Sequence, residues 1–225
     1  MIPRFSLIFL CGGTGTRFKT TIPKQFLQLG SSPIALHSLQ TLQLFSPLEV
    51  CVVCTEEFTA VFNQPGSSYL FAKPGERRQD SVQNGLLTLK KSVEFVLIHD
   101  GARPLIQKKD VEKLITLGMN HGAAALGVRA ESTIRITDKY NIAQNRPERT
   151  LVWEIQTPQI LRYDLLTKGL EKARVQQLTI TDDVAAAELL GVSPLLVEGS
   201  KTNIKITTQE DMAYAKFLLQ EIEHA

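Results

Sequence analysis

Residues able to bind an anion gather near the amino terminus, in the stretch LCGGTGTRFKTTIPKQF (residues 10–26). The stretch contains three glycines and three cations: Gly12, Gly13, Gly15, Arg17, Lys19 and Lys24. No Asp or Glu precedes Glu49, so no carboxylate of this stretch offsets the positive charge. Glycines let backbone N–H groups come close to a ligand, and Arg and Lys balance the charge of a phosphate. The composition of this loop therefore predicts a phosphate-bearing ligand.

The loop matches neither of the two common phosphate-binding motifs. It lacks the GxxxxGK[ST] spacing of P-loop proteins. A dinucleotide fingerprint starting at Gly13 would need glycine where Phe18 stands, and the acidic ribose partner expected about 20 residues later is missing. A nicotinamide-dependent dehydrogenase is therefore disfavoured. A strand-to-helix turn that needs glycine only for its shape remains the alternative, although the clustered cations favour a binding loop.

Two further segments carry candidate site residues. In IHDGARP (98–104), Asp100 ends an apolar run and Arg103 follows three residues later. A carboxylate there could hold Mg²⁺ or accept hydrogen bonds from a polyol, and the alternative is an Asx-turn. In GERRQDSV (75–82), Arg77, Arg78 and Ser81 stand at the start of a predicted helix, where N–H groups favour an anion. The alternative there is a solvated charge run with a helix cap.

The elements that must position these residues alternate along the chain. Strands are expected at residues 5–11, 48–54, 69–73, 94–99, 123–129, 133–137 and 203–207, and helices at 32–45, 56–62, 80–91, 108–122, 181–191 and 208–222. This order predicts an α/β fold of three layers, with a mostly parallel twisted sheet and helices on both faces. Ligands of such sheets bind beyond the carboxyl ends of the strands, which is where the glycine loop and Asp100 fall.

Residues 130–160 do not fit this alternation. Two short β-like runs flank the polar segment DKYNIAQNRPER, which is typical of a hairpin. We expect a protruding β-arm at about residues 132–155. Because such an arm would expose Ile, Val and Trp153, it is expected to pack on a second subunit.

Composition limits the classes of function. The 225 residues have a formal net charge of +2 and no Lys/Arg-rich run, so binding of nucleic acid is not expected. No apolar stretch approaches the roughly 20 residues of a membrane span. The three cysteines, an odd number, suit a reducing compartment, and we expect a cytoplasmic protein forming one domain over 1–225. Cys51 and Cys54 lie on one predicted strand, where residues three apart point to opposite faces and cannot share a metal.

Taken together, the motifs resemble those of a known family. Six segments occur in order: GGTGTR (12–17), PKQ (23–25), DSV (80–82), HDGARP (99–104), QTPQ (156–159) and NIK (203–205). They are similar to the 2-C-methyl-D-erythritol 4-phosphate cytidylyltransferases of the non-mevalonate isoprenoid pathway. The resemblance covers residues 5 to about 220.

The resemblance implies a fold like that of nucleotide-diphospho-sugar transferases, a homodimer with exchanged β-arms and a Mg²⁺-dependent reaction. CTP and methylerythritol phosphate would give the CDP-alcohol and pyrophosphate. The implied catalytic cations are Arg17, Lys24 and Lys205. The implied nucleotide-binding residues are Cys11, Gly12, Gly13, Thr14, Gly15, Thr16, Arg78, Ser81 and Asp100. The implied substrate-binding residues are Asp100, Arg103, Thr133, Arg149, Thr157 and Lys205, with Asp100 also holding the metal and Arg149 reaching the partner subunit's acceptor phosphate.

One departure from the family pattern bears on the acceptor. The family often has Asp just before Asn-Ile-Lys, whereas this chain has Thr202. Metal binding would then depend on Asp100 and the triphosphate. Ribitol 5-phosphate cytidylyltransferases share several of the motifs and can lack that Asp, so ribitol phosphate is the alternative acceptor. A non-catalytic nucleotide-binding module is the alternative from another class.

Overall fold

The computed structural model describes residues 4–13, 18, 22–63, 66–90 and 93–223. The strands of the main sheet are β1 (Phe5–Leu10), β4 (Val50–Val53), β5 (Leu70–Ala72), β6 (Phe95–Asp100), β7 (Ala123–Arg129), β10 (Trp153–Arg162) and β11 (Leu195–Glu198). Two small ribbons pair β2 (Gln28–Leu29) with β3 (Ser32–Pro33) and β8 (Ile136–Thr137) with β9 (Ala143–Asn145). The α-helices are α1 (Ile34–Gln43), α2 (Arg78–Thr88), α3 (Lys108–His121), α4 (Tyr163–Val175), α5 (Ala185–Glu188) and α6 (Gln209–Glu223), and 3₁₀ turns span Lys24–Phe26, Glu56–Phe62 and Arg149–Leu151.

The seven strands of the main sheet lie in the order β11-β7-β10-β6-β1-β4-β5. β1 pairs in parallel with β4 and β6, β4 with β5, and β7 with β11, whereas β10 runs antiparallel to both β6 and β7. The central strands are mostly apolar, as in FSLIFL and FVLIHD, which is expected for strands that are covered on both faces. The predicted mostly parallel sheet is confirmed.

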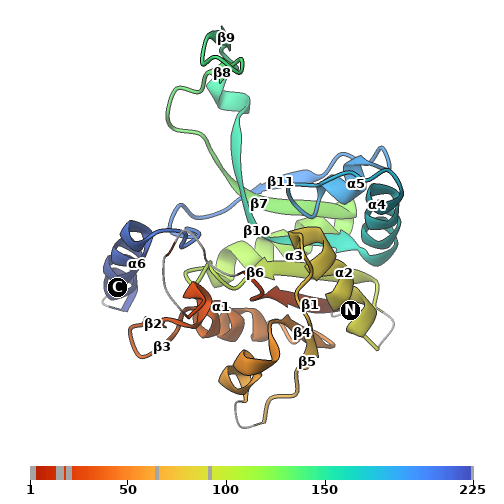
Figure 1. Cartoon of the computed structure of the whole chain (residues 1–225), viewed down its shortest axis with the longest axis vertical. Helices are drawn as coiled ribbons and strands as arrows, with labels where there is room; N and C mark the ends of the chain where they lie inside the picture. Colours follow the sequence, from red (N-terminus) through yellow and green to blue (C-terminus); the bar gives the residue numbers. More distant parts are fainter. Residues whose placement is uncertain (1–3, 14–17, 19–21, 64–65, 91–92, 224–225) are drawn as a thin grey trace.

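Helices cover both faces of this sheet (Figure 1). One buried cluster joins α1 and α3 to Leu7 and Phe9 of β1, and a second joins α2, α4 and α5 to Ile8 of the same strand. Alternate residues of one strand therefore serve opposite cores. Cys54 belongs to the first cluster and Cys51 to the second, so the predicted separation of these two thiols is confirmed. In the described ranges, no helix combines the length and apolar character that a membrane crossing requires.

The chain between β7 and β10 projects away from the sheet as an arm, with the β8–β9 ribbon at its tip (Figure 1). Four large apolar side chains of this arm are each more than half exposed: Ile136, Tyr140, Ile142 and Leu151. The predicted arm is present, but the second β-like run, which follows the polar segment, was wrongly assigned to it. Residues from Trp153 onward belong to β10, a strand of the main sheet, because Gln156 to Leu161 are buried between β6 and β7.

Several predicted elements differ from the structure. Of the strand expected at 133–137, only residues 136–137 form one, and of the helix expected at 181–191 only 185–188 is α-helical. The segment 203–207 is not a strand of the sheet. Its Ile206 N–H donates to the carbonyl of Ala102, and its Thr207 N–H donates to Asp211. Helix α2 begins at Arg78 and not at Asp80, whose carboxylate returns to accept from the Arg77 N–H. Helix α4 and strand β11 were not predicted.

Candidate active site

The parallel pairing of β1 and β6 brings two of the candidate segments together. Leu10 stands opposite Asp100 in this register, so the glycine loop and the HDGARP turn leave the sheet side by side. Gly101 makes the approach possible, since a Cβ at this position would lie 2.4 Å from the Cys11 Sγ. At the next position of the loop, a Cβ on Gly12 would lie 2.5 Å from two side-chain atoms of Pro74. Both glycines are therefore required by close packing around the site.

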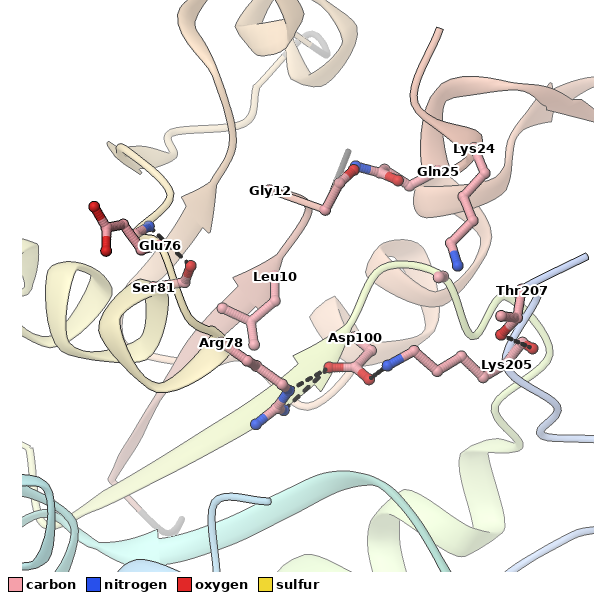
Figure 2. Close-up of a pocket in the computed structure, with 13 residues that line it drawn as sticks. Leu10, Gly12, Lys24, Gln25, Glu76, Arg78, Ser81, Asp100, Lys205 and Thr207 are labelled. Carbon is pink, nitrogen blue, oxygen red and sulfur yellow. Dashed lines mark hydrogen bonds and ion pairs between the residues drawn. The ribbon is translucent and has the colours of Figure 1, made fainter. Parts of the chain in front are cut away.

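A cleft of about 380 Å³ opens at this end of the sheet (Figure 2). Its described lining combines the glycine loop, the start of α2, the end of β6 and the segment before α6: Leu10, Gly12, Gly13, Lys24, Gln25, Gly75, Glu76, Arg78, Ser81, Asp100, Ala102, Lys205 and Thr207. Figure 2 shows the Lys24 side chain extending from its own loop into the space above Asp100 and Lys205. Segments that are far apart in the sequence therefore meet in one cation-rich cleft.

The carboxylate of Asp100 is held between two cations at the floor of the cleft. The Lys205 Nζ lies 2.7 Å from one carboxylate oxygen, and the Arg78 Nε and Nη2 lie 3.1 and 3.0 Å from the other. Burial alone would raise the pKa of Asp100, but Arg78 and then Lys205 outweigh it and hold the pKa well below its usual range. Asp100 is therefore an anion at neutral pH.

Arg78 is itself held by a second buried carboxylate. Its Nη1 and Nη2 lie 2.6 and 2.7 Å from the two oxygens of Asp183, and the Asp183 side chain is only 2% exposed. Gln159 supports this arrangement, because its Oε1 accepts from the backbone N–H groups of Asp183 and Val184. Burial lowers the pKa of Arg78, but the two carboxylates outweigh it and leave the pKa raised. The guanidinium is thus fixed in a bidentate geometry that points it at Asp100.

Asp183 and Gln159 were not singled out from the sequence as site residues. Asp183 falls within the helix expected at 181–191, and Gln159 within the QTPQ motif. Gln25 likewise belongs to the PKQ motif, and nothing in the sequence indicated its own role. The Gln25 Nε2 donates to the carbonyls of Cys11 (2.5 Å) and Gly13 (2.9 Å), so Gln25 fastens the glycine loop from one side.

The start of α2 forms another wall of the cleft. The Ser81 hydroxyl oxygen accepts from the Gly75 N–H at 3.0 Å, which holds the 75–76 segment at the rim. A Cβ on Gly75 would lie 2.4 Å from the Asp80 Cβ, so glycine is needed for this turn. The predicted nucleotide-binding residues Gly12, Gly13, Arg78, Ser81 and Asp100 therefore share one cleft, and Cys11, the residue before Gly12, is buried.

Two other predicted site residues lie behind Asp100 and are not among the described residues that line the cleft. Thr157 is buried, and its hydroxyl oxygen accepts from the Asp100 N–H at 3.0 Å. Arg103 donates through Nη1 to the carbonyl of Asn203 at 2.8 Å, which ties the HDGARP turn to the segment that carries Lys205. Burial lowers the pKa of Arg103.

The remaining predicted residues are not brought into this cleft by the described chain. Thr133 and Arg149 are exposed on the arm, where the Arg149 Nη1 donates to the carbonyl of Glu131 at 3.0 Å. Arg149 lines a separate hollow at the base of the arm, together with Arg129 and Lys201. The predicted residues Thr14, Gly15, Thr16 and Arg17 lie outside the described residues.

The fit of the cleft to a divalent cation depends on Asp100. Among the described residues, no group of three or more His, Cys, Asp and Glu side chains could hold a metal ion alone. Mg²⁺ commonly uses one or two carboxylates together with substrate phosphates, and a carboxylate has about four lone-pair sites for its partners. An ionised Asp100 beside the glycine loop fits such a shared site. Thr202, half-buried in the turn before Asn203, is not part of the described lining.

Comparison with known proteins gives a consistent result. The family model described as IspD, 2-C-methyl-D-erythritol 4-phosphate cytidylyltransferase, matches residues 5–221. A relative named for the same activity, a chloroplastic protein of Oryza sativa subsp. japonica, is 42% identical over 96% of this chain and 74% of its own length. One from Chlamydia pneumoniae is 42% identical over 95% of this chain and 98% of its own.

Solved structures are also similar to this chain. The 4-diphosphocytidyl-2C-methyl-D-erythritol synthase of Anaerococcus prevotii superposes with a TM-score of 0.86 at 26% identity, covering 97% of this chain and 99% of that one. The Francisella tularensis 2-C-methyl-D-erythritol 4-phosphate cytidylyltransferase superposes with a TM-score of 0.81 at 29% identity, covering 95% and 99%. The match to the family model over nearly the whole chain, and relatives at about 40% identity, show that the chain belongs to the 2-C-methyl-D-erythritol 4-phosphate cytidylyltransferase family.

Proposed function

We propose that this chain transfers the CMP moiety of CTP to 2-C-methyl-D-erythritol 4-phosphate. The products are 4-diphosphocytidyl-2-C-methyl-D-erythritol and pyrophosphate. Family membership supports the type of reaction and the pair of substrates. The observation in the structure that carries the proposal is the cleft in which Lys24 and Lys205 face Asp100 beside the glycine loop.

The chemistry requires positioning and charge neutralisation more than proton transfer. An oxygen of the acceptor phosphate attacks the α-phosphorus of CTP in line, the new P–O bond forms, and the bond to the pyrophosphate leaving group breaks. The acceptor phosphate is already an anionic nucleophile, so no covalent enzyme intermediate is needed. The protein must instead align two anions that repel each other.

The roles in this mechanism are assigned to residues of the cleft and, for Arg17, to the predicted cation of the glycine loop. Lys24 and Arg17 balance the charge that develops on the α- and β-phosphates, and Lys205 faces the acceptor phosphate. The glycine loop, the start of α2 and Ser81 hold the nucleotide. Asp100 is the proposed ligand of Mg²⁺, which when bound would supply further charge neutralisation on the triphosphate.

The direct test is pyrophosphate release with CTP and Mg²⁺, comparing methylerythritol 4-phosphate with ribitol 5-phosphate as acceptor. A strong preference for methylerythritol phosphate is expected, and it would mean that Thr202 is compatible with this acceptor. A preference for ribitol phosphate would overturn the proposed acceptor and direct attention to Thr202. Release with neither acceptor would favour the non-catalytic nucleotide-binding module.

We further propose that the protein is a homodimer whose arms are exchanged, and that Arg149 binds the acceptor phosphate in the partner's cleft. Two observations support this assembly. Arg149 is exposed and lies on the arm, apart from the cleft of its own chain. The exposed apolar side chains of the arm would also gain a partner surface.

Subunit complementation tests this assembly. Arg149→Ala and Lys24→Ala chains are each expected to be nearly inactive. Heterodimers of the two contain one cleft with both substitutions and one with neither, so part of the activity should return. Mixing Lys24→Ala with Lys205→Met is the matched control, because both substitutions affect the chain's own cleft and every heterodimeric cleft is defective. Absence of complementation in demonstrated heterodimers would exclude a role for Arg149 across subunits.

A cytoplasmic location is part of the same proposal. All three cysteines are buried as free thiols, which suits a reducing compartment.

A further inference from the structure

His99, the residue before Asp100, is fully buried and has no place in the chemistry above. Its side chain lies on the opposite face of β6 from Asp100 and stacks on Phe9 of β1, with ring centroids 5.9 Å apart and planes inclined by 23°. Both ring nitrogens have polar partners. Nε2 lies 3.1 Å from the carbonyl oxygen of Arg103, and Nδ1 lies 3.2 Å from the hydroxyl of Thr157.

The hydroxyl of Thr157 replaces a backbone acceptor at the end of the sheet. The pairing of β10 with β6 ends at Gln159 opposite Ile98, and β10 is irregular between Ile155 and Gln159. The N–H of Asp100, two residues further along β6, therefore donates to the Thr157 hydroxyl oxygen, at 3.0 Å. Without that hydroxyl, a buried backbone N–H next to the site would lose its partner.

The direction of each hydrogen bond in the series from Arg103 through His99 and Thr157 to Asp100 follows from which groups can donate and which can only accept. The Arg103 carbonyl can only accept, so Nε2 of His99 carries the proton. Nδ1 of the neutral ring is then an acceptor, and the Thr157 hydroxyl donates to it. The same hydroxyl oxygen accepts from the Asp100 N–H, which can only donate.

We propose that His99, with its ring proton on Nε2, acts with Thr157 as a positioning pair that fixes the Asp100–Arg103 turn. The turn is closed internally by the Arg103 N–H, which donates to the Asp100 carbonyl at 3.0 Å. The pair makes a hydrogen bond to each end of the turn: the Thr157 hydroxyl accepts from the Asp100 N–H, and the His99 Nε2–H donates to the Arg103 carbonyl. Asp100 is thereby presented to Arg78 and Lys205 in one geometry. The catalytic consequence rests on the proposed function, whereas the hydrogen-bond arrangement does not.

The surroundings keep this histidine neutral. Burial lowers the pKa of His99 to about 4, and the positive charges of Arg103 and Arg78 act in the same direction, while the Arg103 carbonyl and Asp100 oppose them. A proton on Nδ1 would face the Thr157 hydroxyl as a second donor, and the hydroxyl hydrogen would lose its acceptor. Neutrality and the position of the Thr157 hydrogen are therefore coupled.

Nuclear magnetic resonance of the wild-type protein tests the arrangement without any substrate. Two-bond ¹H–¹⁵N correlations distinguish the two neutral tautomers of an imidazole from the imidazolium. We expect His99 to show the Nε2–H tautomer at neutral pH. An Nδ1–H tautomer would overturn the proposal.

Kinetics of a matched pair of variants test the positioning role. Thr157→Val removes the hydroxyl and keeps the branched shape, whereas Thr157→Ser keeps the hydroxyl. With CTP and methylerythritol phosphate, we expect Thr157→Val to lower kcat by roughly 10–100-fold, the usual effect of losing a residue that orients a metal-binding group. The KM for CTP should change little, because the glycine loop is untouched, and Thr157→Ser should retain most of the activity.

The outcomes separate this inference from the proposed function. Wild-type kcat in Thr157→Val, or equal loss in both variants, would overturn the positioning role. A wild-type protein that is inactive with CTP and either acceptor, methylerythritol phosphate or ribitol phosphate, would overturn the proposed function. The NMR result would still decide whether the His99–Thr157 pair exists.

Discussion

Replacing Arg78 with methionine is predicted to destabilise the protein strongly. The guanidinium is shared between two buried carboxylates and contacts both oxygens of Asp183 and one oxygen of Asp100. Methionine has a similar length but neither the charge nor the donors. Asp100 would keep Lys205 as an ion partner, whereas the 2% exposed Asp183 has no other ion pair among the described residues.

The magnitude follows from leaving Asp183 buried without its cation. Removing one partner of a buried ion pair costs about 3–5 kcal/mol, because the remaining charge stays desolvated and unpaired. This is a large fraction of the roughly 5–15 kcal/mol by which folded proteins are stable. Arg78→Met/Asp183→Asn removes the orphaned charge as well, so the double variant should recover most of the loss.

The difference in free energy of unfolding between wild type and Arg78→Met should depend on pH, because Asp100 titrates. The folded-state pKa of Asp100 lies below the value of about 3.9 expected in the unfolded chain. Its stabilising contribution is therefore complete above about pH 4 and is lost as the pH falls through the lowered folded pKa. Without Arg78 the pKa of Asp100 is lowered less, so acidification removes less of the variant's stability than of the wild type's. The difference in free energy of unfolding between the two proteins should therefore become smaller as the pH falls.

Urea unfolding monitored by circular dichroism gives the free energies of unfolding. Arg162→Met is the matched control, since Arg162 forms an exposed pair with Asp164 and its loss should leave stability close to wild type. The reasoning is refuted if Arg78→Met lies within about 1 kcal/mol of wild type at neutral pH, a loss too small for a broken buried pair. A double variant that is no more stable than the single one would also count against it.

Three further substitutions are predicted to have distinct effects. Lys24→Ala should lower kcat more than it raises the KM for CTP, because the charge acts on the reacting phosphates; normal kcat with only a raised KM would contradict this role. Gly12→Ala places a Cβ 2.5 Å from Pro74 and should weaken CTP binding measured by calorimetry; an unchanged CTP affinity would contradict the packing argument. Gly101→Ala places a Cβ 2.4 Å from the cysteine sulfur at the start of the loop and should lower the urea unfolding free energy by about 1–3 kcal/mol, as overpacking usually does; unchanged stability would show that the backbone can yield there.

Local sequence patterns predicted the elements that have a strong pattern of their own. β1 and β6 are mostly apolar because both faces of each strand are covered, and α3 is capped at its carboxyl end by Gly122, which adopts φ +99°. The segment 203–207 shows why a pattern can mislead. Its two buried residues, Asn203 and Ile206, are three positions apart and so do not follow the alternation of a strand, and its backbone groups bond to a loop and to Asp211.

Strand β10 could not be assigned from the local pattern. It directly follows the largely polar arm, and it contains Gln156, Thr157 and Gln159, which are buried and polar. These side chains are tolerated in the core because each has a partner: Gln156 binds Ser200 and Asn203, and Gln159 holds the Asp183 backbone. Partners that lie 24 or more residues away leave no trace in a local pattern.

The sequence by itself determined the chemical character of the site. A glycine-rich loop with cations and no carboxylates, followed much later by Asp100 at a strand end, is enough to indicate a phosphate ligand at the carboxyl edge of a parallel sheet. Only the tertiary structure decided which charges meet. Arg78 and Lys205 converge on Asp100 from 22 and 105 residues away, and Asp183 orients Arg78 across 105 residues. Their pairing depends on strand order and burial, since charges attract strongly only where the fold excludes water and sets their separation.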